Sequence, residues 1–421
     1  MAKILITTIG TGDNFKDSSG EYKKTNYQID NHLYENRVLV ADALIDHHKF
    51  DKVFFIGTCK SIWDYIYYHY MSLDDEASIG AYEKLLEQRK SEAGVRDEML
   101  FTIEQIIDNK LQSNGSKCFL LEYSKKDHEE LQKNFMALLQ IKEFIDENDE
   151  IYLDITHGFR YIPILNILLV QFLLIYTNNS FKVPAIYYGM LSSPISEVIN
   201  FREFFDLIEW ANAISAFKKR LDADALIDVM SANKVEDEVK KVFRQINSNI
   251  QLANLGSLWQ FFKSAKNKIE RIKNTKLPLL SFLHEDLIKL VDRLNVDKLS
   301  LFQFEIAKWF YENHQYALSY LALHEAIITK FCELKFPDKN CEDKELRGTV
   351  KIKHIDYPYD EYFLEKRNTK SPNLDSITNI RNSIAHQLND RKDKVNQDID
   401  RLKVFIEYYQ PLFYEADKSN K

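Results

Sequence analysis

The most constraining feature of the sequence is a strand, a polar turn and a long apolar helix that follow one another over residues 150–176. The turn is Thr156-His157-Gly158, and Arg160 lies in the first helical turn. A hydroxyl, an imidazole, a glycine that permits close backbone approach and a guanidinium thus gather at a helix N-terminus, which suits an anion such as phosphate. An ordinary turn capped by Thr156, with His157 in solvent, is an equally weighted alternative.

Other short apolar runs lie in the first half of the chain, at residues 4–9, 52–57, 117–123 and 182–190, and the first of them is rich in β-branched residues. Helical patterns separate them, over about 35–47, 82–111 with a break near Gly94, and 127–145. Strands that alternate with helices predict βαβ crossovers and a doubly wound, Rossmann-like parallel sheet. Ligands of such sheets bind beyond the carboxyl ends of the strands.

Three of the predicted strands end in polar loops in which a glycine lies close to a threonine or serine. The first loop contains Gly10, Thr11 and Gly12, the second Gly57, Thr58 and Ser61, and the third Thr156, His157, Gly158 and Arg160. Together at one sheet edge, these loops favour a phosphate-rich ligand. The chain has no full G-x-G-x-x-G fingerprint after its first strand, which argues against NAD.

The second half of the chain is predicted to be helical, because nine of the 11 glycines lie before residue 200. Helices are expected at about 201–219, 222–230, 235–264 with a possible break near Gly256, 280–294 and 301–313. An αα-hairpin over 304–331 and helices over 374–388 and 395–409 would form a closing bundle. We therefore expect an α/β domain at 1–200, a helical linker domain at 201–300 and a helical bundle at 301–421.

Composition narrows the class of protein. The net charge of −8 argues against a general nucleic-acid-coating surface but permits a local basic cleft. The four cysteines are scattered without a C-x-x-C pair, so neither a disulfide framework nor a zinc site is expected. The N-terminus lacks the features of a signal peptide, and the apolar run at 162–176 is shorter than the ~20 residues that span a bilayer. We expect a cytoplasmic protein. His47 and His48 are expected to lie on a solvated face.

A second chemical feature stands on the predicted helix at 374–388. Asn382 and His386 are four residues apart and share one face, and Arg381 has the reach to join them. An imidazole can move protons at a 2′-hydroxyl or a leaving oxygen, and a guanidinium can hold a phosphate, so this trio could cleave RNA without metal. The alternative is an ordinary surface helix. The apolar stripe that would face the bundle consists of Ile377, Ile380, Ile384 and Leu388.

Both features resemble motifs of one kind of protein. The segment from Asp154 to Arg160 resembles the D-x-T-H-G motif of a CRISPR-associated family, and Gly57 to Asp64 resembles that family's second-strand loop. Phe204 to Trp210 looks like its linker helix. Arg381 to His386 resembles the R-N-x-x-x-H motif of HEPN nucleases.

The resemblance implies a CARF–HEPN ribonuclease of type III CRISPR defence. It implies a homodimer, or a higher oligomer, whose CARF domains bind cyclic oligoadenylate through the three loops and whose HEPN domains, at 301–421, cut single-stranded RNA without metal or another cofactor. Cyclic tetra-adenylate is the expected activator and cyclic hexa-adenylate the alternative. Two other functions stay open: a regulator that binds the ring without RNA cleavage, and a ring nuclease in which Thr156 and His157 take part. The implied nuclease residues are Arg381, Asn382 and His386.

Overall fold

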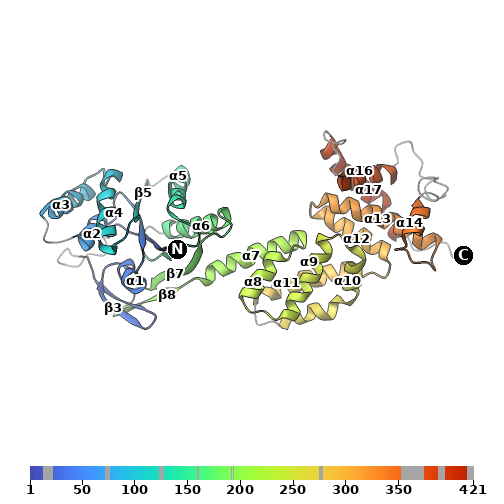
Figure 1. Cartoon of the computed structure of the whole chain (residues 1–421), viewed down its shortest axis with the longest axis horizontal. Helices are drawn as coiled ribbons and strands as arrows, with labels where there is room; N and C mark the ends of the chain where they lie inside the picture. The colour runs from blue at the N-terminus through green and yellow to red at the C-terminus, as the bar shows by residue number, and fades with distance from the viewer. Residues whose placement is uncertain are drawn as a thin grey trace. The chain divides into compact units, whose positions relative to one another are not determined.

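The chain divides into two compact units, Met1–Asp206 and Leu207–Lys421 (Figure 1). A computed structural model describes residues 1–12, 22–71, 76–122, 128–158, 161–190, 192, 194–274, 278–351, 374–386 and 394–414. Within these residues no helix is both long and apolar enough to cross a membrane.

The first unit is built on one eight-stranded sheet of order β3-β2-β8-β7-β6-β1-β4-β5. Strands β5, β4, β1, β6 and β7 run parallel to one another, and β2 is parallel to β8, whereas β7–β8 and β2–β3 are antiparallel pairs. The strands are β1 Lys3–Thr8, β2 Thr25–Ile29, β3 His32–Arg37, β4 Lys52–Thr58, β5 Lys117–Leu121, β6 Glu150–Asp154, β7 Lys182–Met190 and β8 Ile195–Asn200. The predicted parallel sheet is confirmed for its five core strands.

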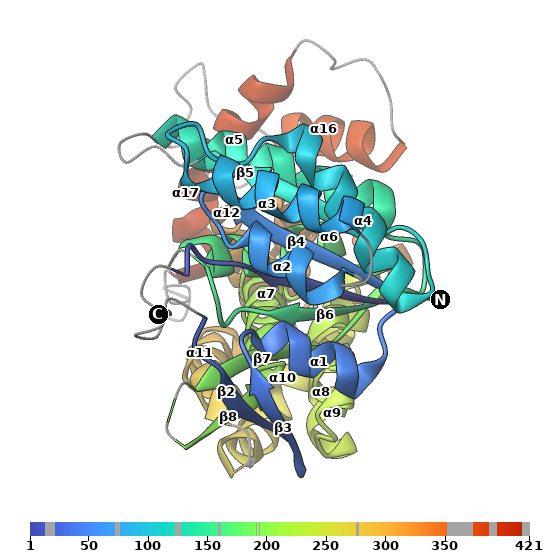
Figure 2. The same cartoon turned by 90° about the vertical axis from the view of Figure 1, so that its left-hand side faces the viewer.

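Helices cover both faces of this sheet, as predicted for a doubly wound fold (Figure 2). One core joins the sheet to α1 Val40–His48, α2 Trp63–Tyr70, α3 Glu76–Lys90 and α4 Asp97–Leu111. The opposite core joins it to α5 His128–Leu138, the 3₁₀ helix η2 Leu139–Phe144 and α6 Tyr161–Tyr176. Along β1, Leu5 belongs to the first core and Ile4 and Ile6 to the second, which is the period-two alternation of a strand buried on both faces.

The predicted helix over residues 35–47 is wrong in its first part. Residues 25–37 form the β2–β3 hairpin, and α1 begins only at Val40. The sequence of β2, Thr25–Ile29, mixes polar and apolar residues, so it lacks the continuous apolar run that marked the buried strands. Asp30, at the turn between the strands, adopts a left-handed conformation with a φ of 51°. The hairpin and β8 turn the expected parallel sheet into a mixed one.

The expectation that His47 and His48 lie on a solvated face is also wrong. The missed hairpin and the sheet cover this end of α1, so both rings are half-buried. The His47 Nδ1 atom lies 2.8 Å from the Tyr34 hydroxyl oxygen, and the His48 Nε2 atom lies 2.6 Å from that of Tyr187. Burial, and then the neighbouring His47, lower the pKa of His48 to about 4.

The second unit is helical and has one core shared by its helices. The predicted long helix over 235–264 is divided near Gly256, as expected, because Ala253 adopts a left-handed φ of 49°. Helices α12 and α13 form the predicted αα-hairpin, and α16 and α17 pack against α13. The helices are α7 Glu203–Arg220, which begins in the first unit, α8 Asp224–Ala232, α9 Asp237–Gln251, α10 Leu255–Glu270, the 3₁₀ helix η3 Arg271–Asn274, α11 Pro278–Leu294, α12 Leu299–Glu312, α13 Tyr316–Lys335, α14 Lys344–Val350, α16 Leu374–His386 and α17 Val395–Tyr414.

The lowered pKa of His48 predicts a pH dependence of stability. The half-buried imidazole of His48 is neutral in the folded protein and is protonated more readily in the unfolded chain. Its contribution to the free energy of unfolding of the first unit is therefore fully present above about pH 6.5 and is lost as the pH drops toward 4. We expect His48→Gln to reduce this loss by at most ~2 kcal/mol, since solvent screens a half-buried group. Urea unfolding at pH 7 and pH 5 measures it, with His32→Gln as the exposed control. Equal losses in wild type and His48→Gln would contradict the prediction.

Candidate functional site

The three predicted loops meet at one edge of the sheet. They follow β6, β1 and β4, which are neighbouring parallel strands. The Ile62 backbone N–H donates to the Gly10 carbonyl oxygen at 2.9 Å and so joins the second loop to the first. The Thr8 hydroxyl donates to the His157 carbonyl oxygen and joins the first loop to the third. Three segments that are far apart in the sequence are therefore joined to one another at one edge of the sheet.

Glycines allow the first and third loops to approach closely. Gly158 has a φ of +103°, and a Cβ atom there would lie 3.0 Å from the Cβ atom of Thr8. A Cβ atom on Gly10 would lie 3.5 Å from the Gly158 backbone nitrogen. Gly10 and Gly158 are both half-buried, so their backbone remains within reach of a ligand. This is the close backbone approach that the sequence pattern predicted.

The polar side chains of the second loop are directed into the protein. The Ser61 hydroxyl donates to the Ile9 carbonyl oxygen and accepts from the Thr58 backbone N–H, each at 2.9 Å. Thr58 and Ser61 are fully buried, and Gly57 is buried beneath them. These groups hold the loop against β1, and their contact with a ligand stays a prediction.

The third loop contains a buried histidine, His157, and a half-buried threonine, Thr156. The His157 Nε2 atom accepts a hydrogen bond from the Val40 backbone N–H at 3.2 Å, which satisfies an N–H group at the start of α1. Burial lowers the pKa of His157, although the carboxylates of Asp154 and Asp42 act to raise it, so the ring is neutral. A solvated His157 is therefore excluded. The Thr156 hydroxyl accepts from the Gly189 N–H at 2.8 Å, and Arg160 lies outside the described residues.

The first loop is held by a residue that the motifs did not reveal. Thr11 is half-buried, and its carbonyl oxygen accepts a hydrogen bond from Nη1 of Arg89 at 3.0 Å. The Arg89 Nε atom lies 2.9 Å from Oδ1 of Asp64. Gly12 is buried with a φ of +72°, and a Cβ atom there would collide with Ile62 at 2.4 Å. The only sequence signal for Arg89 is its place one helical turn after Leu85, the other buried residue of α3.

The predicted nuclease residues share α16 in the second unit. Nη1 of Arg381 donates to Oδ1 of Asn382 at 3.0 Å, so these two side chains are in contact. Both are half-buried, whereas His386 is exposed at the helix end. Ile377 and Ile380 are buried as expected for the apolar stripe, and Leu388 lies outside the described residues. Within the described part of this helix, no hydrogen bond joins His386 to Arg381 or to Asn382.

A carboxylate on α13 that sequence reasoning missed lies beside Arg381. Oε1 of Glu325 is 3.9 Å from Nη2 of Arg381, and its other oxygen pairs with Arg347. Burial acts to raise the pKa of Glu325, but the hydrogen bond to His324 and the charge of Arg347 outweigh it and lower the pKa to about 2. Glu325 is therefore ionised and gives Arg381 a fixed counter-charge. Nδ1 of the buried His324 imidazole lies 3.2 Å from the same Oε1 atom.

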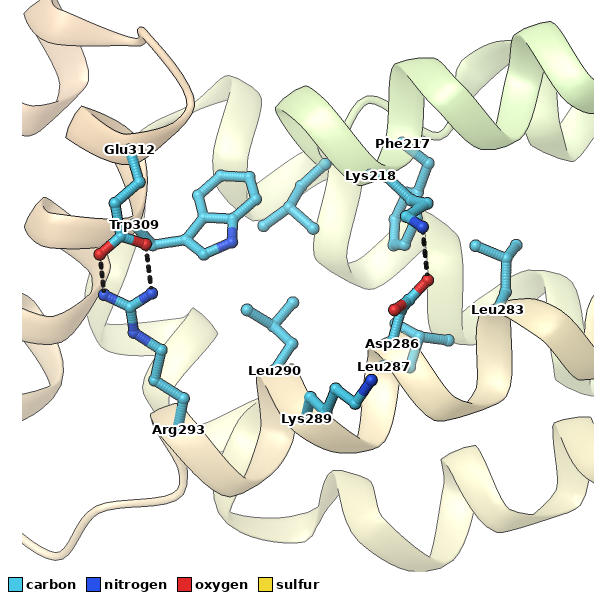
Figure 3. A pocket seen from close by; sticks show the side chains of 11 residues that line it. Phe217, Lys218, Leu283, Asp286, Leu287, Lys289, Leu290, Arg293, Trp309 and Glu312 are labelled. Atoms are coloured by element: carbon cyan, nitrogen blue, oxygen red, sulfur yellow. Dashed lines mark hydrogen bonds and ion pairs between the residues drawn. The ribbon is translucent and has the colours of Figure 1, made fainter.

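The second unit also contains an open pocket of about 280 Å³ between α7, α11 and α12 (Figure 3). Its floor is apolar, with Leu287, Leu290 and Trp309 among its residues. Ion pairs occupy its two ends: Lys218 and Asp286 lie 2.7 Å apart, and Arg293 contacts both Glu312 oxygens at 2.6 and 2.9 Å. None of the predicted site residues lines it. Among the described residues there is also no cluster of three His, Cys, Asp or Glu side chains able to hold a metal.

Two family models match the chain. Residues 4–191 match the CARF domain of the CRISPR system endoribonuclease Csx1. Residues 206–298 match the second domain of CRISPR-associated protein MJ1674. CRISPR-associated protein MJ1674 of Methanocaldococcus jannaschii is 29% identical in an alignment of 408 positions that covers 92% of this chain. The chain spans 62% of that relative's length.

Among solved structures, Enterococcus italicus Csm6 bound to cyclic hexa-2'-fluoro-hexa-dAMP aligns with the whole chain, with low structural and sequence similarity. The alignment covers 100% of this chain and 96% of Csm6, with 12% identity and a TM-score of 0.38. The two family matches lie in the expected order along the chain, and the first contains all three loops. The resemblance drawn from the D-x-T-H-G motif is thus confirmed: residues 4–191 match the CARF domain of a CRISPR system endoribonuclease, and the following segment matches a domain of a second CRISPR-associated protein.

Proposed function

We propose that this protein is a ribonuclease of type III CRISPR defence that binds cyclic oligoadenylate in its CARF domain and then cuts single-stranded RNA without metal. The observation that carries the proposal is the meeting of three glycine-containing loops after β6, β1 and β4 in a domain matched by the Csx1 CARF model. The nuclease part rests on the R-N-x-x-x-H pattern of α16.

In this proposal the half-buried groups of the loops contact the ring. Among the predicted loop residues that the structure describes, Gly10, Thr11, Thr156 and Gly158 are half-buried rather than fully buried. Backbone N–H groups and hydroxyls there can donate to phosphate oxygens, as they do in other phosphate-binding loops. Cyclic tetra-adenylate is the proposed activator and cyclic hexa-adenylate the alternative.

A homodimer would place two copies of these loops around one symmetric ring. Helix α6, which follows the third loop, carries an exposed apolar face that supports this arrangement. The exposed side chains recur at helical spacing: Ile164 60%, Leu168 53%, Phe172 43%, Ile175 61% and Tyr176 63%. An exposed apolar stripe of this kind is typical of a protein interface. A second copy of the chain, related by a two-fold axis, is the proposed occupant.

At the proposed nuclease site, His386 would act as the general acid or base on RNA. Arg381 would hold the scissile phosphate and stabilise its developing charge, and Asn382 would orient Arg381 through their 3.0 Å hydrogen bond. One α16 helix offers a single exposed imidazole, so two copies across a two-fold axis would supply an acid and a base. A cleft between two copies reconciles RNA binding with the net charge of −8.

Cleavage of the ring by the CARF domain is a less supported alternative. His157 is buried, neutral and engaged by the Val40 N–H, so it is poorly placed to transfer a proton to a ligand. A CARF regulator without RNA cleavage remains the second alternative to the nuclease proposal.

The exposed face of α6 predicts the effect of a single charge on assembly. Leu168→Asp should weaken dimerisation at least tenfold, because a carboxylate would have to be buried at the interface. Sedimentation equilibrium of wild type and variant measures this. Phe101→Asp is the control, since Phe101 is 60% exposed on α4 of the same unit. An unchanged association constant in Leu168→Asp would remove α6 from the interface.

The nuclease proposal predicts separable effects on cleavage and binding. His386→Ala should lower the rate of RNA cleavage at least a hundredfold, since general acid–base catalysis supplies roughly 10²–10⁴. Affinity for the ring, measured by calorimetric titration, should not change, because the loops lie in the other unit. His314→Ala, an exposed histidine of the same unit, is the control. Wild-type cleavage by a preparation of His386→Ala would exclude His386 from the mechanism.

A further inference from the structure

The end of α3 and the turn after it contact both of the first two loops. We call residues 89–95 the bridging turn. Its Arg89 side chain reaches the first loop at the Thr11 carbonyl oxygen, 3.0 Å away. Its Val95 backbone N–H donates to the Cys59 carbonyl oxygen of the second loop at 2.8 Å. One short segment therefore spans two loops that belong to different strands.

The second loop returns contacts to the same segment. Nζ of Lys60 donates to the Ser91 carbonyl oxygen and lies 3.5 Å from that of Arg89. These carbonyls are at the C-terminal end of α3, where a cation is favourable. Gly94 has a φ of +73°, and a Cβ atom there would lie 2.7 Å from the Cys59 carbonyl oxygen. The bridging turn and the second loop thus fit together at backbone distance.

Arg89 is anchored before it reaches the first loop. It is 7% exposed, and its Nε atom lies 2.9 Å from the Asp64 carboxylate, which is almost fully buried. The Tyr22 hydroxyl donates to the same carboxylate at 3.2 Å. A buried ion pair contributes little net stability, but removing one partner leaves an uncompensated charge in the interior. The pair therefore restricts Arg89 to the orientation in which Nη1 meets the Thr11 carbonyl.

We infer that Arg89 is a positioning residue for the ligand: through Asp64 and the Thr11 carbonyl it fixes the first loop relative to the second. This inference rests on the proposed function, because it assigns Arg89 a part in binding cyclic oligoadenylate. Arg89 touches the loop backbone and acts through Thr11 rather than as one of the predicted ligand contacts. A lysine cannot replace it, since one ammonium lacks the planar fork that serves Asp64 and Thr11 together.

The first test needs no ligand. Hydrogen–deuterium exchange of the full-length protein is compared between wild type, Arg89→Lys, Asp64→Asn and Arg96→Ala. Arg96 is the matched control, because it follows the bridging turn but is exposed and pairs with Glu98 at 3.5 Å. We expect amides of the first and second loops to exchange at least tenfold faster in Arg89→Lys and Asp64→Asn, with the β1 and β4 amides unchanged. Unchanged loop exchange in both variants would overturn the inference.

The second test measures binding. Calorimetric titration with cyclic tetra-adenylate and cyclic hexa-adenylate should show at least a tenfold loss of affinity in Arg89→Lys and in Asp64→Asn. The double variant should lose no more than either single one, because the two residues act as a unit. A faster-exchanging loop that keeps wild-type affinity would overturn the positioning role.

The two tests also separate this inference from the proposed function. Wild-type protein that binds neither ring would contradict cyclic oligoadenylate sensing and, with it, the part assigned to Arg89 in binding. The exchange result would then still decide whether Arg89 fixes the loops. Thermal unfolding of each variant shows whether a loss of affinity reflects global unfolding. If Arg89→Lys does not fold, Asp64→Asn, which keeps the shape of the side chain, provides the same test.

Discussion

The candidate ligand surface depends on the parallel pairing of β1 with both β4 and β6. Parallel neighbours bring their carboxyl ends to the same edge of the sheet. The loops after residues 8, 58 and 154 are therefore adjacent, although the first and the last are 146 positions apart in the sequence. The hydrogen bond from Ile62 to Gly10 and that from Thr8 to His157 then fix the loops to one another. Packing of helices on both faces keeps the strands in this order.

The sequence was most informative where one local pattern decides the structure. Continuous apolar runs identified the core strands, and Gly158 marked the close approach at the third loop because its φ of +103° disfavours other residues. The β2–β3 hairpin was missed because Thr25–Ile29 is a short strand of mixed polarity, for which the helical pattern nearby competed. The buried state of His157 could not be predicted either, since its partner Val40 is 117 positions away.

Polar partners from distant helices were likewise beyond the sequence. Arg89 and Glu325 carry no motif, yet one holds the Thr11 carbonyl and the other lies 3.9 Å from Arg381. The buried Arg89–Asp64 pair orients the Arg89 guanidinium toward a predicted ligand-binding residue, and Glu325 lies beside the guanidinium of a predicted nuclease residue. Asp64, which pairs with Arg89, belongs to the segment that resembles the family's second-strand loop. The structure gives a physical reason for an aspartate at this position, because Asp64 holds the arginine that connects two loops.

In the proposed function, a ring of adenylates bound by the three loops switches on RNA cleavage by the helical unit. The most direct measurement is the rate of cleavage of labelled single-stranded RNA with no activator, with cyclic tetra-adenylate and with cyclic hexa-adenylate, each in excess EDTA. We expect one ring to raise the rate strongly, the other ring to leave it unchanged, and EDTA to have no effect. Cleavage that proceeds equally without a ring, or that EDTA abolishes, would contradict the proposed function.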